Sequence, residues 1–81
     1  MAHVVLYGKS GCHLCQDARA AVLAVAAGRS FELEEVDVSL DPALHRLYGE
    51  RIPVITVDGE EAFEHFVDPD ALRRRLDRVD A

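Results

Sequence analysis

The spacing of apolar and polar positions changes several times along the chain, and each change marks an expected element. Residues 3–7 form a short apolar run, rich in β-branched residues and closed by glycine, which is typical of a buried strand. Apolar residues recur at helical spacing over 12–27, and Gly28 is the expected stop. Residues 31–38 alternate in two phases, which predicts a second strand with a bulge at Glu34 and Glu35. The inward stripe of the helix should comprise Leu14, Ala18, Ala21, Val22 and Val25.

Two Asp-Pro pairs open the helices of the second half. Asp41 and Asp68 can each cap a helix with a carboxylate, and the proline that follows suits the first helical position. Between these helices, 51–57 is an apolar strand entered through a proline, and an Asp-Gly pair favours a tight hairpin into a strand over 61–65. The first of these two helices should end at Gly49. We expect Leu44, Leu47, Tyr48, Leu72, Leu76 and Val79 to face inward, Phe31, Phe63 and Phe66 to lie in the core, and the last helix to fray near Ala81.

The order of these elements, β-α-β-α-β-β-α, determines the expected fold. A strand, a crossover helix and a second strand form a parallel pair with right-handed connection, whereas the later hairpin is antiparallel. The chain has no repeat and no linker that would divide it. We therefore predict a single α/β domain over residues 1–81, with a mixed four-stranded sheet and helices on both faces.

Composition and charge exclude several classes of function. The net charge of −6 argues against nucleic-acid binding, which needs basic residues to neutralise phosphates. No apolar run approaches the roughly 18 residues of a membrane helix, and the N-terminus lacks the basic start of a signal peptide. Two cysteines are too few for the disulfide framework of a small secreted domain. We expect a cytoplasmic monomer that binds neither nucleic acid nor membranes.

The chemistry that the sequence offers is concentrated in Cys12 and Cys15, its two cysteines. Their spacing places both on one face of the first helical turn, where unpaired N–H groups and the helix dipole stabilise a thiolate. Lys9 adds positive charge, and His13, when protonated, would lower the pKa of a nearby thiol. The alternative for both is an exposed side chain without such a role. Asp17 is a candidate proton relay or, alternatively, part of a solvated helix face.

Three functions are compatible with this pair. In thiol–disulfide exchange, Cys12 would attack the substrate and Cys15 would resolve the mixed disulfide. Alternatively, the same cysteines could hold a metal ion or an iron–sulfur cluster, or the domain could serve in binding with little turnover. No second Cys or His pair has the spacing of a closed zinc site, so we predict no metal ligands within one chain.

A CxxC pair at the start of the helix after the first strand is typical of thioredoxin-like redox proteins. The whole chain resembles a minimal glutaredoxin, and most closely the bacterial glutaredoxin-like proteins with Tyr-x-x-x-x-Cys-x-Leu-Cys near the start. The resemblance implies a thioredoxin-like fold of glutaredoxin type and a thiol–disulfide oxidoreductase. The matching residues are Tyr7, Lys9, Gly11, Cys12, Leu14 and Cys15, then Ile52, Pro53, Val54 and Gly59.

The resemblance also implies a substrate site. Pro53 would be a cis-proline facing the CxxC pair, and the backbone of Ile52 would pair with an extended substrate. We predict Lys9, His13, Leu14, Ile52 and Pro53 as substrate-binding residues. The substrate would be a disulfide-containing protein or a low-molecular-weight thiol, with a reductase or thiol donor as electron source and no tightly bound cofactor.

Two departures from the family pattern concern that electron source. His13-Leu14 replaces the usual Pro-Tyr or Pro-Phe between the cysteines. The segment 66–69 lacks the two glycines with which glutathione-binding members hold the γ-glutamyl end. The sequence therefore leaves open whether glutathione or another thiol is the reductant.

Overall fold

The computed structural model describes residues 1–80, and its elements follow the predicted order with one short 3-10 helix added. The bounds are β1 His3–Gly8, α1 His13–Ala26, β2 Glu32–Asp37, η1 Val38–Leu40, α2 Pro42–Tyr48, β3 Val54–Val57, β4 Glu60–Glu64 and α3 Pro69–Asp80. Within these residues, every helix is too short or too polar to cross a membrane. The expected fraying at Ala81 lies outside the described residues.

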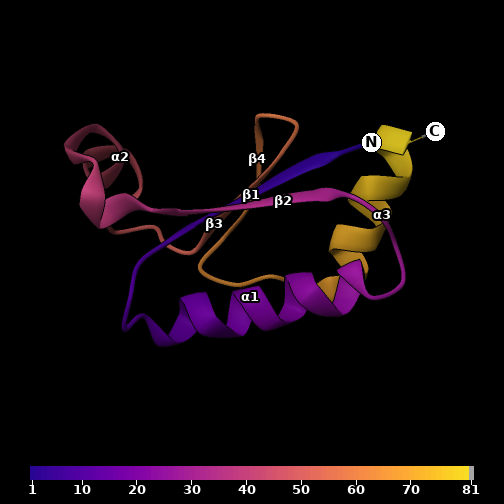
Figure 1. Cartoon of the computed structure of the whole chain (residues 1–81), viewed down its shortest axis with the longest axis horizontal. Helices are drawn as coiled ribbons and strands as arrows, with labels where there is room; N and C mark the ends of the chain where they lie inside the picture. Colours follow the sequence, from indigo (N-terminus) through magenta and orange to yellow (C-terminus); the bar gives the residue numbers. More distant parts are fainter. Residues whose placement is uncertain (81) are drawn as a thin grey trace.

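The four strands form one mixed sheet in the order β2-β1-β3-β4. β1 pairs in parallel with β2 and antiparallel with β3, and β3 and β4 form the antiparallel hairpin. In Figure 1, α1 runs along one side of the sheet and α2 lies on the opposite side. This arrangement confirms the predicted α/β fold class with helices on both faces.

Two apolar clusters hold the helices on the sheet. Because side chains alternate along a strand, Val4 and Leu6 of β1 face the first cluster, whereas Tyr7 packs against the second. The first cluster joins β1 and β3 to α1 and α3. The second cluster contains Cys15 and Tyr48, so it connects the start of α1 to α2. The buried helical residues of the first cluster are Ala18, Val22, Val25, Leu72 and Leu76.

The local signals for helix starts and for the hairpin are confirmed. The carboxylate of Asp41 accepts hydrogen bonds from the backbone N–H groups of Ala43 and Leu44, at 2.9 and 3.4 Å. Asp68 accepts one from the N–H of Asp70 at 3.0 Å. The turn residues Asp58 and Gly59 have φ values of 51° and 85°. Both are positive, as this two-residue hairpin turn requires.

The bulge expected at Glu34 and Glu35 is wrong. The register between β1 and β2 is continuous, and the irregularity lies instead between β3 and β4 at Ile55 and Thr56. The two glutamates project to opposite faces, where Glu34 contacts His3 and Glu35 binds Arg19 of α1 at 2.7 Å. The change of phase in the sequence therefore reflects a strand with polar partners on both faces.

Four residues expected to face inward are exposed instead. Leu47 belongs to a helix of two turns whose buried contact is made by Tyr48, and Val79 lies in the last turn of α3, beyond Leu76. Leu14 and Phe66 are 51% and 70% exposed. Phe31 and Phe63 do pack against the first cluster as partly buried residues.

We expect Leu72→Ala to lower the free energy of unfolding by about 2–5 kcal/mol, because it opens a cavity under a fully buried side chain. The matched control is Leu40→Ala, whose side chain is 82% exposed and should change stability by less than about 0.5 kcal/mol. Urea unfolding followed by circular dichroism measures both. Equal losses in the two variants would contradict this placement of the core.

Candidate functional site

The two cysteines lie at the N-terminus of α1 and are joined as a disulfide, with their Cα atoms 5.2 Å apart. Cys12 is the N-cap residue, so its backbone is extended while the helix begins at His13. Its Sγ accepts a hydrogen bond from the backbone N–H of Cys15 at 3.2 Å. This N–H is one of the unpaired donors of the first turn, and it is aimed at the sulfur rather than at solvent.

Burial distinguishes the two sulfur-bearing residues. Cys15 is 6% exposed and belongs to the second cluster, whereas Cys12 is partly exposed at its edge. Gly8, at the end of β1, makes room for the buried residue, because a Cβ atom there would lie 3.0 Å from the Sγ of Cys15. The missing side chain at Gly8 therefore lets α1 start this close to the end of β1.

The predicted cis bond is present between Ile52 and Pro53. Ile52 is buried in the second cluster together with Cys15, and Cys12 packs against that cluster. The carbonyl oxygen of Pro53 accepts a hydrogen bond from the backbone N–H of His65 at 2.8 Å. The structure therefore brings Cys12, Cys15 and Ile52 together, and it connects Pro53 to the segment that follows β4.

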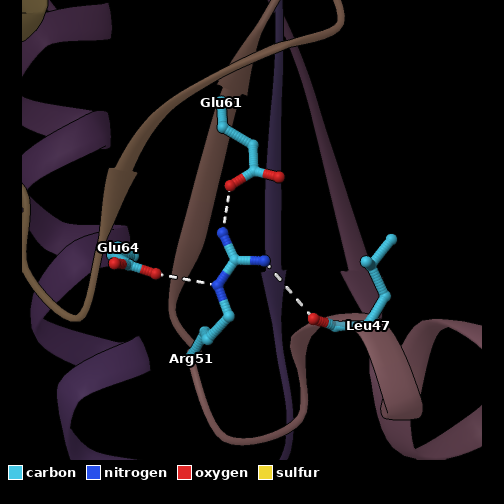
Figure 2. Close-up of polar contacts among 4 residues, drawn as sticks. All are labelled: Leu47, Arg51, Glu61 and Glu64. Carbon is cyan, nitrogen blue, oxygen red and sulfur yellow. Dashed lines mark hydrogen bonds and ion pairs between the residues drawn. The ribbon is translucent and has the colours of Figure 1, made fainter.

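Arg51 anchors the segment that precedes this proline (Figure 2). Its Nε donates to Glu64 at 2.8 Å, a second nitrogen donates to Glu61, and a third reaches the carbonyl oxygen of Leu47 at 3.4 Å. The hydrogen bond from the Arg51 guanidinium holds the pKa of the Glu64 carboxyl below its ordinary value of 4.5. Arg51 was not predicted from the sequence; the signal that could have found it is the pair of glutamates on the predicted hairpin strand, which need a cation nearby.

The same arginine extends the anchor to β1 through aromatic rings. Its guanidinium lies 5.5 Å from the centre of the Tyr48 ring, and Tyr48 lies 4.5 Å from Tyr7, centre to centre. Burial raises the pKa of Tyr7, and the nearby Tyr48 and Glu34 raise it further. The Tyr7 hydroxyl therefore stays neutral at physiological pH. Contacts from β1, α2 and β4 thus hold the second cluster, in which Cys15 is buried.

A cavity of about 310 Å³ opens beside Cys15 between the start of α1 and the end of β2. Lys9 lines it together with Asp37, whose pKa is lowered by hydrogen bonds from Ser39 and by the charge of Lys9. The predicted residue Lys9 therefore borders the same cavity as the buried cysteine. The cavity is lined by Leu6, Gly8, Lys9, Ser10, Cys15, Gln16, Arg19, Glu35, Val36 and Asp37.

The remaining predicted residues, His13 and Leu14, are the first two residues of α1, and both are exposed. Leu14 faces a second, smaller hollow that it shares with the segment after β4. Among residues 1–80, no group of three or more His, Cys, Asp or Glu side chains is placed to hold a metal ion.

Comparison with known families gives a match over nearly the whole chain. The glutaredoxin-like domain family (DUF836) matches residues 3–77. The chain belongs to this family. The recognition of a glutaredoxin-like protein from its sequence motifs is therefore confirmed. No curated protein matches the chain.

Solved structures similar to this glutaredoxin-like domain share its fold. Protein Ne2328 from Nitrosomonas europaea is 32% identical, with a TM-score of 0.79 over 91% of this chain and 89% of that chain. Protein XcR50 from X. campestris is 33% identical, with a TM-score of 0.75 over 93% and 96%. A mutant thioredoxin from Halobacterium salinarum is 26% identical, with a TM-score of 0.71 over 95% and 73%. Fold, family and cysteine pair together support a redox function.

We expect Gly8→Ala to destabilise the oxidised protein by about 1–3 kcal/mol, because the new methyl group would press on Cys15 and force α1 away from β1. Gly28→Ala is the matched control, since a Cβ there meets no atom within 4 Å. Denaturant unfolding of the oxidised proteins measures the difference. If Gly8→Ala is as stable as Gly28→Ala, the contact between β1 and Cys15 does not restrict this position.

We expect Arg51→Gln to flatten the acid part of the stability profile. The pKa of Glu64 is lowered in the folded state, so the unfolded chain binds more protons, and wild type loses stability as pH falls through this range. Without Arg51, Glu64 should titrate near its ordinary pKa, and this part of the slope should vanish. Urea unfolding between neutral pH and about pH 2.5 measures the slope, and NMR titration follows the Glu64 carboxyl. Arg74→Gln, on the exposed side of α3, is the control and should keep the wild-type profile.

Proposed function

We propose that this glutaredoxin-like protein is a thiol–disulfide oxidoreductase that reduces disulfides by a dithiol mechanism. The observation that supports this most is the Cys12–Cys15 disulfide at the N-terminus of α1, with Cys15 buried and Cys12 partly exposed. Such an arrangement suits one sulfur that meets the substrate and one that acts only within the protein.

The reaction would proceed in two exchanges. The Cys12 thiolate attacks one sulfur of the substrate disulfide, and the other substrate sulfur leaves as a thiolate that takes a proton from solvent. The Cys15 thiol loses its proton and attacks the Sγ of Cys12, which releases the second substrate sulfur as a thiol. The substrate gains two electrons and two protons, and the protein is left with the Cys12–Cys15 disulfide.

The electrostatics of the helix start favour Cys12 as the nucleophile. In the reduced protein, the N–H of Cys15 could donate to a Cys12 thiolate as it donates to the sulfur now, at 3.2 Å. The first turn of α1, which the structure describes completely, carries no acidic residue that would oppose this charge. Lys9 adds a positive charge near the same end, and His13 would add a second when protonated. These features lower the pKa of a thiol in that position.

The substrate would lie between the helix start and the Ile52-Pro53 segment. We propose that the backbone of Ile52 pairs with the chain beside the substrate cysteine, that Pro53 closes this side, and that Lys9, His13 and Leu14 contact the rest. The donor that regenerates the thiols would be glutathione, another small thiol or a reductase. We propose a cytoplasmic monomer without a tightly bound cofactor.

We expect the purified protein, equilibrated in graded glutathione buffers and read by intact mass, to form and lose its internal disulfide at about −270 to −200 mV. Cys12→Ser should abolish reduction of disulfides, because no exposed nucleophile remains. Cys15→Ser should accumulate a mixed disulfide on Cys12, because the resolving thiol is missing. Full activity in Cys12→Ser would contradict the mechanism. Bound iron or zinc in freshly purified protein, together with thiols that fail to react across the series, would favour the metal-binding alternative.

A further inference from the structure

An apolar patch lies beside the disulfide and shares no lining residue with the cavity of about 310 Å³. It is formed by Leu14 and Phe66, which come from the start of α1 and from the segment between β4 and α3. The two side chains border a hollow of about 80 Å³. The Leu14–Phe66 patch, as we name it, comprises the residues around that hollow, Leu14, Asp17, Ala18, His65, Phe66 and Val67.

The exposure of these two side chains is not explained by the fold. Phe66 is 70% and Leu14 51% exposed, although burial would stabilise each of these apolar side chains. Large contiguous apolar patches on soluble proteins mark interaction sites, and here the two exposed side chains border one hollow. Phe66 is followed by Val67, which is buried in the first cluster, so the backbone here is fixed while the phenyl ring faces solvent.

Two observations connect the patch to the proposed substrate site. Leu14 lies between Cys12 and Cys15 in the sequence, on the exposed surface of the first turn. His65 donates its backbone N–H to the carbonyl oxygen of Pro53 at 2.8 Å. A chain held at the Ile52-Pro53 segment with its cysteine at Cys12 would therefore have its neighbouring side chains over the patch.

The backbone at the patch is itself unusual. His65 has a φ of 67°, in the left-handed region that non-glycine residues seldom adopt because it strains the backbone. Such conformations are kept where the surrounding structure holds them, often at binding sites. Here the hydrogen bond to Pro53 holds His65, and Phe66 follows directly after it.

Charge indicates what kind of partner fits. Asp17 is exposed, lies one turn after Leu14 on α1, and borders the same hollow. It is the one carboxylate among the residues that line the hollow, and the whole chain carries a net charge of −6. A partner with an apolar side chain in the hollow and a basic side chain beside Asp17 would complement both the apolar lining and the negative charge.

We propose that the Leu14–Phe66 patch is a docking subsite for a partner polypeptide that places an apolar side chain and an adjacent basic side chain next to its disulfide cysteine. The inference rests on the proposed oxidoreductase function and names its substrate class, a disulfide within a protein segment. A small disulfide has no side chain that reaches the patch, so the patch contributes nothing to its reduction.

The test compares three substrates with the full-length protein. One is a disulfide-linked peptide with Phe-Lys beside its cysteine, the second carries Gly-Glu at the same positions, and the third is 2-hydroxyethyl disulfide. We expect wild type to prefer the Phe-Lys peptide over the Gly-Glu peptide by about tenfold or more in kcat/KM. Phe66→Ala should lower kcat/KM for the Phe-Lys peptide about fivefold to tenfold and leave that for 2-hydroxyethyl disulfide unchanged within about twofold. Leu23→Ala is the control, since its side chain is also exposed on α1 but lies about 13 Å along the helix from Leu14.

Asp17→Lys tests the charge separately. It should reduce or invert the preference for a Phe-Lys over a Phe-Glu peptide. The introduced lysine repels the basic side chain of the first peptide and attracts the acidic side chain of the second. With the Cys15→Ser protein, the mixed disulfide to the Phe-Lys peptide should show NMR contacts between the peptide ring and Phe66.

The outcomes separate the two proposals. If all disulfides are reduced equally well by wild type, or if Phe66→Ala slows peptide and small disulfide alike, the docking subsite is wrong while the oxidoreductase function stands. If wild type reduces none of the substrates, both proposals fail. If the trapped mixed disulfide shows the peptide ring away from Phe66, the subsite is overturned whatever the rates.

Discussion

The close packing of Cys15 at the end of β1, where Gly8 carries no side chain, is the constraint on which the site depends. β1 runs through the centre of the sheet, paired on both sides, so its last residue has a fixed position. The absence of a side chain at Gly8 lets α1 begin directly against the strand end. Cys15 is thereby buried, and Cys12, three residues earlier at the cap, remains at the surface. One glycine at the end of a central strand thus contributes to the different environments of the two sulfurs, together with the cluster that buries Cys15.

The sequence predicted those features whose cause lies within a few residues. The caps at Asp41 and Asp68 and the turn at Asp58 form from hydrogen bonds and backbone angles that the local residues themselves set. The order of the elements then leaves few ways to build the sheet. The position of Cys12 and Cys15 at a helix start followed from the same reasoning, and the family motif supplied the cis bond before Pro53.

What the sequence could not show depends on partners far away in the chain. An apolar residue at helical spacing is predicted to be buried, but burial needs a neighbour, and neither Leu14 nor Phe66 has one that covers it. Glu34 and Glu35 suggested a bulge because the pattern contains no information about His3 and Arg19, which bind them on opposite faces. Arg51 was not predicted because its partners Glu61 and Glu64 lie 10 and 13 residues further along the chain, on β4.

The surroundings of the disulfide differ on its two sides, and this difference bears on how a partner would approach. Towards β2, the charged residues Lys9 and Asp37 border the cavity that reaches the buried Cys15. Towards α3, Leu14 and Phe66 present apolar surface next to the segment bonded to Pro53. A polypeptide gains more from covering exposed apolar side chains than from displacing water around charged groups. A partner chain should therefore lie mainly across the apolar side, with its disulfide at Cys12. The interior of the cavity then stays open to solvent, so that Cys15 can lose its proton there.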